Sequence, residues 1–413
     1  MHVLVTCFGT RGDIQPYAAL AGALVRAGHQ ATLATAEGFH DLAPDGVARA
    51  EVGSEMLRLL EQVMPELSGA KDALRTLGIM KRAMMQQNDE LWTAAREVRP
   101  DVLLYHPKMI AARHVAEALG VPGVLSLPLP YFTPTRDFLQ PLFGAGRTPG
   151  WLNRASYGVR RSTGLLYGGM LNDFRRRLGL PRLGRLADPL TGPDGRAVNV
   201  LYPYSRHVVP TPSDYPPSAH VTGYWFLDQP EWTPPSELAD FLSSGAPPVY
   251  IGFGSMGFGK GAQQRRDAVL GALAATGQRG IVATGWGGIA SGASPSDNVL
   301  VVEAVPHDWL FPRVAGVVHH GGAGSTAAGL RAGRPTLVVP FLGDQPFWGA
   351  RVHSIGAGPA PLPVRRLAEG LTIRLDELVA SPSYARRAAE VGELIRAEDG
   401  LANGVRILER LAG

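Results

Sequence analysis

Apolar and polar positions alternate in blocks along the first 130 residues. Short apolar runs, of the length of a strand, recur at 2–7, 30–35, 101–105 and 122–126. Residues 15–27 and 109–119 instead carry Ala and Leu at helical spacing, and Gly28 is a typical helix stop. Strands alternating with helices of this length predict a parallel sheet that is covered on both faces.

A second series of the same kind begins near residue 249. Its apolar runs lie at 249–253, 279–284, 299–305, 316–319 and 336–340. The stretch 364–411 has the pattern of several helices. The sequence therefore predicts the α/β class, with two Rossmann-like doubly wound domains facing across a cleft. A ligand is expected between them, at the carboxyl ends of the strands.

Prolines mark the boundary between these two series. They are dense from 203 to 248, which is typical of a linker between domains. We therefore expect an N-terminal domain at 1–205, a linker at 206–245 and a C-terminal domain at 246–413. The last helices could pack back on the first domain.

Composition narrows the class of protein. Hydrophobic residues make up 45% of the 413 residues and charged residues 18%, which is enough apolar surface for two cores and argues against disorder. The single cysteine, Cys7, excludes a disulfide framework and a cysteine-rich zinc site, and it favours a cytosolic protein. A net charge of +4 argues against a nucleic-acid binder. The opening apolar run is too short, and lacks the basic flank, for a signal peptide, and no run is long enough to cross a membrane.

Charge is nevertheless uneven, because the stretch 135–196 is rich in arginine. One interpretation is contact with an anionic membrane surface that supplies a lipid acceptor. The other is an ordinary solvated helical face. The arginines that define the stretch are Arg147, Arg154, Arg160, Arg161, Arg175, Arg176, Arg177, Arg182, Arg185 and Arg196.

The strongest local signal is the run 319–326, His-His-Gly-Gly-Ala-Gly-Ser-Thr, which follows a strand and opens a helix. Glycines let an anion approach the backbone, and a helix start offers unpaired N–H groups. No Lys follows the glycines and no Gly-x-Gly-x-x-Gly is present there, which excludes two common nucleotide motifs. No Asp-x-Asp pair occurs, so a metal held by carboxylates is unsupported. The run predicts a phosphate site that needs no metal and no cofactor, and the alternative is a glycine-rich turn with packed histidines.

Two further loops carry candidate polar groups. Asp344 and Gln345 follow a strand, and a carboxylate beside an amide can bind vicinal hydroxyls. Asp13 follows the first strand, close to Thr10, and could act as a general base. For both aspartates the alternative interpretation is a carboxylate that caps a helix.

Taken together, these motifs resemble one known superfamily. The stretch 8–16 (Phe-Gly-Thr-Arg-Gly-Asp-Ile-Gln-Pro) is similar to the N-terminal motif of bacterial natural-product glycosyltransferases and sterol glucosyltransferases. Five later segments of this chain resemble the donor-binding half of the same UDP-glycosyltransferase superfamily, and they follow one another in the order found in that superfamily. These are 252–255, 284–288, 305–311, 319–326 and 343–348. The stretch 221–226 looks most like the sterol glucosyltransferase branch.

The resemblance implies a GT-B fold and an inverting, metal-independent transfer of a hexose from a UDP- or dTDP-sugar. Asp13 would be the general base with Thr10 beside it, and Asp344 and Gln345 would bind the donor sugar. Trp286 and Val305 are candidates for the nucleobase site. The donor diphosphate would be bound by Ser255, His320, Gly322, Gly324, Ser325 and Thr326. The chain departs from the plant pattern, because Asp13 stands where plant members have a catalytic histidine.

The acceptor is expected in the N-terminal half. Its pocket would be lined by aromatic side chains, for which the alternative is ordinary core packing. Such a pocket suits a sterol, triterpenoid, polyketide or macrolide. Rival functions are a nucleotide-sugar epimerase or hydrolase and a non-catalytic nucleotide-sugar-binding protein. The candidate acceptor residues are Phe8, Tyr131, Phe132, Phe138 and Trp348.

Overall fold

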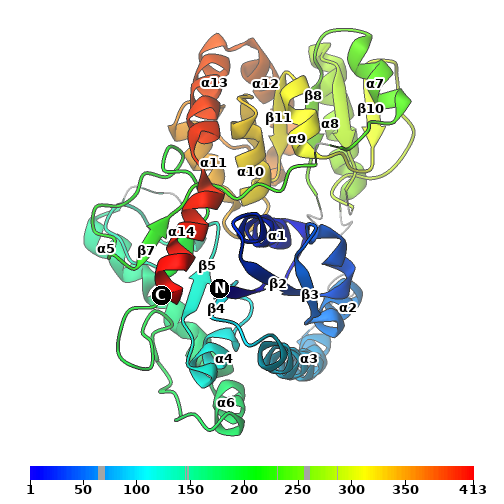
Figure 1. Cartoon of the computed structure of the whole chain (residues 1–413). Coiled ribbons are helices and arrows are strands. Elements are labelled where there is room, and N and C mark those ends of the chain that lie inside the picture. The colour runs from blue at the N-terminus through cyan, green and yellow to red at the C-terminus, as the bar shows by residue number, and fades with distance from the viewer. Residues whose placement is uncertain (64–69, 145, 147, 230, 255–260, 286) are drawn as a thin grey trace.

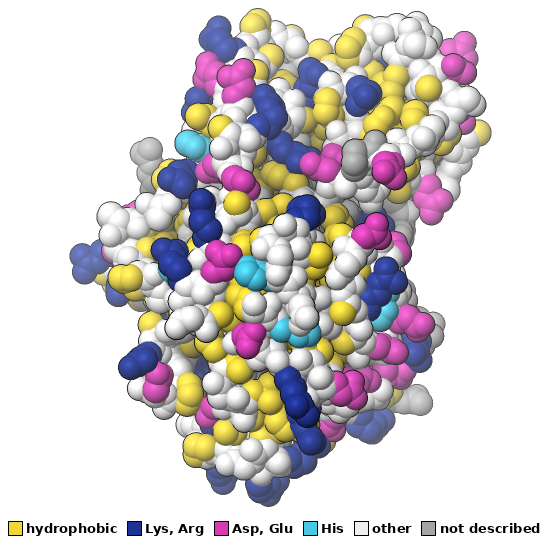
Figure 2. All heavy atoms as spheres, in the orientation of Figure 1, with side chains coloured by type: hydrophobic (Ala, Val, Ile, Leu, Met, Phe, Trp, Pro, Cys, Tyr) yellow, Lys and Arg dark blue, Asp and Glu magenta, His cyan; other side chains and the backbone are white. Residues whose placement is uncertain are grey.

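The computed structural model describes residues 1–63, 70–144, 146, 148–229, 231–254, 261–285 and 287–413, leaving out the side chains of 61–77. Figure 1 shows two domains, each built around its own sheet. In the same view, Figure 2 shows acidic and basic side chains interspersed over this face of the molecule. No helix within the described residues has the length and apolar character needed to cross a bilayer.

The N-terminal domain holds a seven-stranded parallel sheet in the order β3-β2-β1-β4-β5-β6-β7. Its strands are β1 (His2–Thr6), β2 (Gln30–Thr35), β3 (Ala48–Glu51), β4 (Val102–Tyr105), β5 (Gly123–Ser126), β6 (Val200–Tyr202) and β7 (Ala219–Val221). Its helices are α1 (Arg11–Arg26), α2 (Ser54–Val63), α3 (Ala70–Val98), α4 (Ala112–Leu119), α5 (Gly150–Ser156) and α6 (Ser162–Arg177). Shorter 3₁₀ turns are η1 (Glu37–Leu42), η2 (Pro141–Phe143) and η3 (Tyr157–Arg161).

The two faces of this sheet bury alternate residues of the same strand. In β1, Val3 and Val5 pack with α1, whereas Leu4 packs on the opposite face with residues of α3 and α4. This period of two is what a strand imposes on its side chains. Because both faces are covered, β1 is apolar along most of its length, which is the signal that the sequence showed.

The C-terminal domain repeats the arrangement with a five-stranded parallel sheet in the order β10-β9-β8-β11-β12. Its strands are β8 (Val249–Gly252), β9 (Gly280–Ala283), β10 (Val299–Val302), β11 (Gly316–His319) and β12 (Thr336–Val338). Its helices are α7 (Ser236–Ser243), α8 (Ala262–Thr276), α9 (His307–Leu310), α10 (Ala323–Arg331), α11 (Gln345–Ser354), α12 (Leu367–Ala380) and α13 (Pro382–Ala397), with turns η4 (Phe311–Arg313) and η5 (Val364–Arg366). Ile251 faces the helices α8 and α12, and Tyr250 faces the other side.

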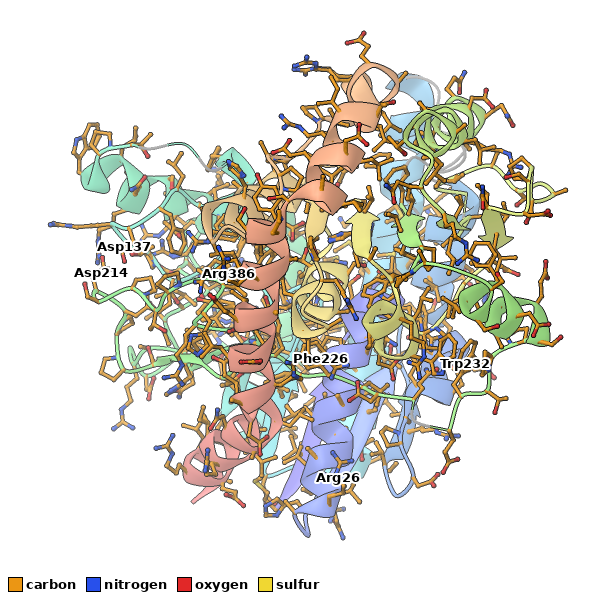
Figure 3. All side chains as sticks on the ribbon, turned by 90° about the horizontal axis from the view of Figure 1, so that it is seen from above. Arg26, Asp137, Asp214, Phe226, Trp232 and Arg386 are labelled. Atoms are coloured by element: carbon orange, nitrogen blue, oxygen red, sulfur yellow. The ribbon has the colours of Figure 1, made fainter. Side chains whose placement is uncertain are left out.

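The segment expected as a linker, 206–245, contains regular structure. The N-terminal sheet extends into it, because β7 pairs with β6 and closes that edge. The chain then crosses to the second domain, and Figure 3 shows the crossing segment running from Phe226 towards Trp232. The guanidinium of Arg331 lies 3.8 Å from the ring centre of Phe226, and the rings of Trp232 and Trp309 are 5.0 Å apart.

The chain returns to the first domain at its carboxyl end. Helix α14 (Gly400–Ala412) packs on α1, and Figure 1 shows it (red) lying on the N-terminal domain. Gly404 allows the close approach, because a Cβ there would lie 3.0 Å from Leu20. The indole of Trp225 donates a hydrogen bond to the carbonyl of Gly400.

Candidate active site

The strand order of the first domain places two loops side by side at one edge of its sheet. Strands β1 and β4 are hydrogen-bonded neighbours, and the strands that follow each lie on opposite sides of the pair. The crevice at such a point, outside the carboxyl ends of the strands, is where open α/β sheets bind ligands. Helix α1, which follows the loop after β1, carries Asp13 in its first turn, and the loop after β4 carries His106 and Lys108.

Three groups hold the Asp13 carboxylate. Its Oδ2 atom accepts from the backbone N–H of Thr10 at 2.8 Å, from the Thr10 hydroxyl at 3.1 Å and from Lys108 Nζ at 2.9 Å. Burial opposes ionisation, but the charge of Lys108, the ring of His106 and these hydrogen bonds outweigh it, so the pKa of Asp13 lies below its usual value. Gly9 has φ +141°, and a Cβ there would overlap Asp13 and lie 2.7 Å from Lys108 Nζ.

His106 faces the other oxygen of Asp13. Its Nδ1 accepts from the backbone N–H of Lys108 at 3.2 Å, so Nε2 carries the ring proton. That Nε2 lies 3.7 Å from Asp13 Oδ1. Burial lowers the pKa of His106 to about 4, although Asp13 favours the protonated ring. His106 is therefore a neutral donor aimed at a carboxylate that is ionised at neutral pH.

The capping interpretation of Asp13 is also correct. Helix α1 starts at Arg11, earlier than the sequence indicated, and Asp13 occupies its third position, bonded back to Thr10. One Asp13 oxygen stabilises the helix start, while Oδ1 faces His106. The side chain keeps 23% of its surface exposed, so a substrate hydroxyl can reach it.

The C-terminal sheet has the same neighbouring pair, β8 and β11. His319 ends β11 and is buried, and its Nδ1 accepts from the N–H of Gly321. His320 lies between two glycines, because a Cβ at Gly322 would lie 2.6 Å from its Nε2 and one at Gly254 would lie 3.4 Å from its Cε1. Burial lowers the pKa of His320 to about 4, and its buried Nδ1 has no hydrogen-bond partner among the described residues.

Helix α10 begins directly after these glycines, with Gly322 as its N-cap residue. Gly324 is exposed and Ser325 is half-buried in the first turn, so both are accessible to an anion at the helix start. Thr326 is oriented differently from our expectation. It is fully buried and its hydroxyl donates to the Gly322 carbonyl at 2.9 Å, which engages it within the helix.

Asp344 and Gln345 open helix α11 beside this edge. Trp348 Nε1 donates to Asp344 Oδ2 at 2.9 Å, and Gln345 Oε1 accepts from the backbone N–H of Phe341 at 2.7 Å. Burial raises the pKa of Asp344, and the negative charge of Asp13 adds to it. The two aspartates come from different domains and are close enough to repel each other. The candidate base and the candidate sugar-binding carboxylate therefore share one site.

Comparison with known proteins decides the family. Residues 3–135 match the glycosyltransferase family 28 N-terminal domain, and residues 268–411 match the erythromycin biosynthesis protein CIII-like C-terminal domain. A sterol 3-beta-glucosyltransferase of Arabidopsis thaliana is 36% identical over 98% of this chain and 65% of that protein. The O-mycaminosyltylonolide 6-deoxyallosyltransferase of Streptomyces fradiae is 32% identical over the whole of this chain and 98% of that protein. The chain belongs to this family of glycosyltransferases.

Solved structures of glycosyltransferases share the fold of this family member. The glycosyltransferase of kitacinnamycin superposes with a TM-score of 0.74 at 20% identity, covering 100% of this chain and 99% of that one. The glycosyltransferase VinC, solved in complex with dTDP, superposes with a TM-score of 0.65 at 22% identity, again over 100% and 99% of the two chains. The expected two-domain GT-B architecture is thus confirmed.

The aromatic residues expected in the acceptor pocket of this glycosyltransferase lie in different parts of the molecule. Phe132 and Tyr131 contact each other, with ring centres 4.9 Å apart, and Phe138 contacts Phe347 of the second domain at 5.9 Å. Phe8 is buried in the core of the first domain. Trp348 is fully buried and its indole is bonded to Asp344, so it is a core residue that supports this carboxylate and does not face an acceptor.

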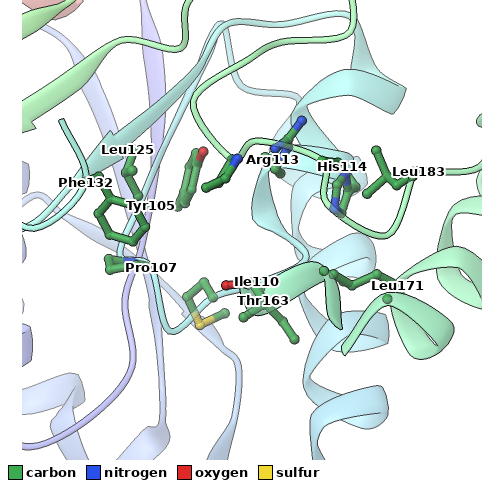
Figure 4. A pocket seen from close by; sticks show the side chains of 16 residues that line it. Tyr105, Pro107, Ile110, Arg113, His114, Leu125, Phe132, Thr163, Leu171 and Leu183 are labelled. Carbon is green, nitrogen blue, oxygen red and sulfur yellow. The ribbon is translucent and has the colours of Figure 1, made fainter. Parts of the chain in front are cut away.

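Phe132 also lines a cavity beneath helix α6 of about 80 Å³ (Figure 4). The inner wall of this cavity includes Tyr105, Pro107 and Leu125, at the carboxyl end of β4 and on β5. Pro107 stands between His106 and Lys108, so one residue of the cavity wall belongs to the same loop as the two groups that face Asp13. Ligand pockets usually measure roughly 300–1,000 Å³, so the cavity as it stands holds only part of a polycyclic acceptor.

Three candidates remain without a structural test. Ser255 and Trp286 lie outside the described residues. Val305 is half-buried in the loop after β10, beside the cluster around Phe311. Among the described residues, no three or more His, Cys, Asp or Glu side chains are grouped so that they could hold a metal ion.

Sequence reasoning missed His106 and Lys108. Neither stands in a recognisable motif, and both are distant from Asp13 in the chain. Their common signal is position, because both follow the strand that neighbours β1 in the sheet. The rule that ligands bind between such strands would have selected this loop once the strand order was known.

Proposed function

We propose that this protein transfers a hexose from a nucleotide diphosphate sugar to a hydroxyl of an apolar acceptor, with inversion and without a metal ion. The observation that carries this proposal is that Asp13, whose pKa is lowered beside Lys108, is near enough to Asp344 of the other domain for its charge to raise the pKa of Asp344. A base and a sugar-binding carboxylate at one site can bring an acceptor hydroxyl and an anomeric carbon together. Orienting two reactants in this way removes a large entropic part of the barrier.

The base step follows from the contacts of Asp13. Because Lys108 and Thr10 occupy Oδ2, Oδ1 is the atom left to accept the acceptor's proton. The acceptor oxygen then bonds to the anomeric carbon, and the bond from that carbon to the phosphate oxygen breaks. Its electron pair leaves with the nucleoside diphosphate. Attack from the face opposite the leaving group inverts the anomeric centre.

The leaving diphosphate gains negative charge, and the C-terminal site suits it. The start of α10 offers backbone N–H groups and the positive end of a helix dipole. The buried, unpartnered Nδ1 of His320 is a further group that a ligand could satisfy. We propose UDP-glucose or a dTDP-sugar as the donor, and the related protein solved with dTDP supports a nucleotide of this kind.

The acceptor class is proposed from two sources. Relatives are named for sterol and tylonolide substrates, both of which are bulky and largely apolar. In this chain the cavity that includes Pro107 is lined mainly by apolar side chains, with Arg113 and His114 also contributing (Figure 4). An alcohol of the sterol, triterpenoid, polyketide or macrolide type would place its hydroxyl at Asp13 and its rings on this side.

The proposal is tested first by screening UDP- and dTDP-sugars against such acceptors and reading the product by its mass. The variant Asp13→Asn is then assayed with the active pair, and Asp45→Asn, an exposed aspartate of the same domain, is the control. We expect kcat to fall roughly 10²- to 10⁴-fold for Asp13→Asn, the usual contribution of a general base, and to stay unchanged for the control. Calorimetric titration with donor should show that Asp13→Asn still binds it.

Two results would contradict the proposal. If Asp13→Asn keeps normal turnover, Asp13 is not the base. If the wild-type protein consumes donor with every acceptor but forms no glycoside, the protein is a hydrolase or epimerase of the same fold.

A further inference from the structure

Exposed large apolar side chains are concentrated in one part of the molecule. Ten such residues occur among the described residues, and seven of them belong to the stretch 142–186. Leu166 has 72% of its surface exposed and Trp151 has 70%. Contiguous exposed apolar surface usually marks a binding surface. The seven residues are Leu142, Phe143, Trp151, Leu152, Leu165, Leu166 and Leu186.

Three of the seven lie on two segments that touch each other. Helix α6 touches the loop that follows it, because a Cβ at Gly164 would lie 2.6 Å from the carbonyl oxygen of Arg185. Leu165 and Leu166 are exposed on this helix, and Arg185 and Leu186 are exposed on this loop. We call this surface the α6 patch and define it as Leu165, Leu166, Arg182, Arg185 and Leu186.

The charge of this region is strongly positive. The stretch 135–196 holds eleven arginines, four aspartates and no Lys or Glu, a net charge of +7, whereas the whole chain carries +4. Seven of these arginines contact a carboxylate, for example Arg160 with Asp188 and Arg175 with Glu117. Within the described part of the chain, no carboxylate lies close enough to pair with Arg182 or Arg185, and both are exposed. Among the described arginines of this stretch, Arg136 is the third that is exposed and lacks such a partner, so the α6 patch holds two of the three.

From this arrangement we propose that the α6 patch docks on a lipid bilayer that carries anionic headgroups. Leucines can enter the acyl region while arginines remain at the headgroups, which is the chemistry of an interfacial surface. Figure 2 shows yellow and dark-blue side chains side by side at the lower end of the molecule, where Figure 1 places α6.

The α6 patch lies on the outer side of elements that line the cavity. The same helix and loop that expose Leu165, Leu166 and Leu186 line the cavity on their inner side, through Gly168, Leu171 and Leu183 (Figure 4). A bilayer on the outer side would lie one element away from this cavity. An acceptor that dissolves in lipid could then reach the site without crossing water. The docking itself does not depend on which donor or acceptor the protein uses.

The test is sedimentation of the full chain with vesicles of phosphatidylcholine and phosphatidylglycerol, compared with vesicles of phosphatidylcholine alone. We expect binding to the anionic vesicles and much weaker binding to the neutral ones. The double variant Leu165→Gln/Leu166→Gln should bind anionic vesicles roughly 10- to 100-fold more weakly, because two leucines lose their burial in lipid. Arg182→Gln/Arg185→Gln should lose roughly 5-fold per arginine, and added salt should remove this difference.

Matched controls lie in the second domain. Ile373→Gln/Leu394→Gln changes two other exposed apolar residues, and Arg365→Gln/Arg366→Gln changes two other exposed arginines. Both controls should bind vesicles as the wild type does. The proposal is overturned if the wild type ignores anionic vesicles or if the controls weaken binding as much as the patch variants. It is also overturned if the wild type is a dimer that Leu165→Gln/Leu166→Gln converts to a monomer, since a second copy would then cover the patch.

Discussion

The two sheets have the same strand order around their central crevice, 3-2-1-4-5 in each domain's own numbering, yet they present different chemistry there. The N-terminal crevice holds a carboxylate, with an ammonium group and a neutral imidazole each facing it. The C-terminal crevice holds glycines, a helix start, one buried imidazole and one half-buried imidazole, and His320 Nδ1 is left without a partner among the described residues. One edge is organised around a side-chain charge and the other around backbone dipoles. A common topology thus fixes where a ligand binds, and the residues in the two loops decide what kind of group is accommodated.

After Asp13→Asn, the largest effect is expected from crowding the C-terminal edge. In Gly322→Ala the new methyl would displace His320, whereas the backbone at Gly322, with φ −62°, accepts alanine. Loss of a hydrogen bond to a charged diphosphate should raise the donor KM roughly 10- to 100-fold. Gly271→Ala on α8, where a Cβ meets nothing within 4 Å, is the control and should be neutral. Unchanged donor affinity in Gly322→Ala would exclude His320 from the donor site.

The next effect concerns the imidazole on the N-terminal edge. His106→Leu removes the donor facing Asp13 Oδ1 and should lower kcat about 10-fold, since a hydrogen bond to a charged group is worth about 1.5–3 kcal/mol and this contact is long. His106→Gln places an amide N–H near the position of Nε2 and should recover most of the activity. Circular dichroism of both variants checks that they are folded. Equal losses in the two variants would make His106 a packing residue only.

A smaller effect, visible mainly in the pH profile, is expected for Lys108→Gln. Lys108 lowers the pKa of Asp13, so its removal raises that pKa. Because the base acts only when ionised, the acid limb of kcat/KM should move to higher pH, with a loss of a few-fold near neutrality. Folding stability should respond in the same sense. In the wild type, Asp13 stabilises the fold at pH values above its unfolded pKa, and this stabilisation is lost as the pH falls through its folded pKa. In Lys108→Gln the folded pKa is higher, so the loss should occur at a higher pH. An unmoved acid limb would show that the ion pair does not control the base.

The smallest effect is expected for Thr10→Ala, which tests whether Thr10 takes part in catalysis directly. The variant loses the hydroxyl bond to Asp13 Oδ2 but keeps the shorter bond from the backbone N–H. We expect kcat to fall about 2-fold and stability to fall by about 1 kcal/mol through the lost helix cap. A fall as large as that of Asp13→Asn would give the hydroxyl a catalytic role of its own.

Local patterns in the sequence were sufficient to predict the fold and one key residue in each of the two crevices. Apolar runs of strand length gave Gln30–Thr35 and Gly316–His319 to the residue, because strands buried on both faces consist mainly of apolar and small residues. Asp13 and His320 were found because each stands in or just after the loop that follows such a strand. Both loops carry glycines that allow close approach, and this is a property of adjacent residues that a sequence displays.

Contacts between distant residues were beyond the reach of these patterns. His106 and Lys108 meet Asp13 only because β4 pairs with β1, and no spacing in the chain encodes that pairing. Trp348 was expected in a pocket because it is aromatic and close to Asp344, but its indole points at the carboxylate from within the core. Thr326 was expected to face the donor, and instead its hydroxyl turned back to its own helix. Side-chain direction depends on packing, and packing is a property of the whole fold.

The return of α14 to the first domain has a consequence for exchanging domains between relatives. The N-terminal domain is discontinuous in the chain, because Val405, Ile407 and Leu408 complete the core around α1. A chimera joined only once, in the segment after β7, would pair an α1 from one parent with an α14 from the other. A chimera joined twice, after β7 and again near Gly400, would keep each core from a single parent. The two junctions are neighbours in space, because a Cβ at Gly223 would lie 3.2 Å from the Cα of Gly400.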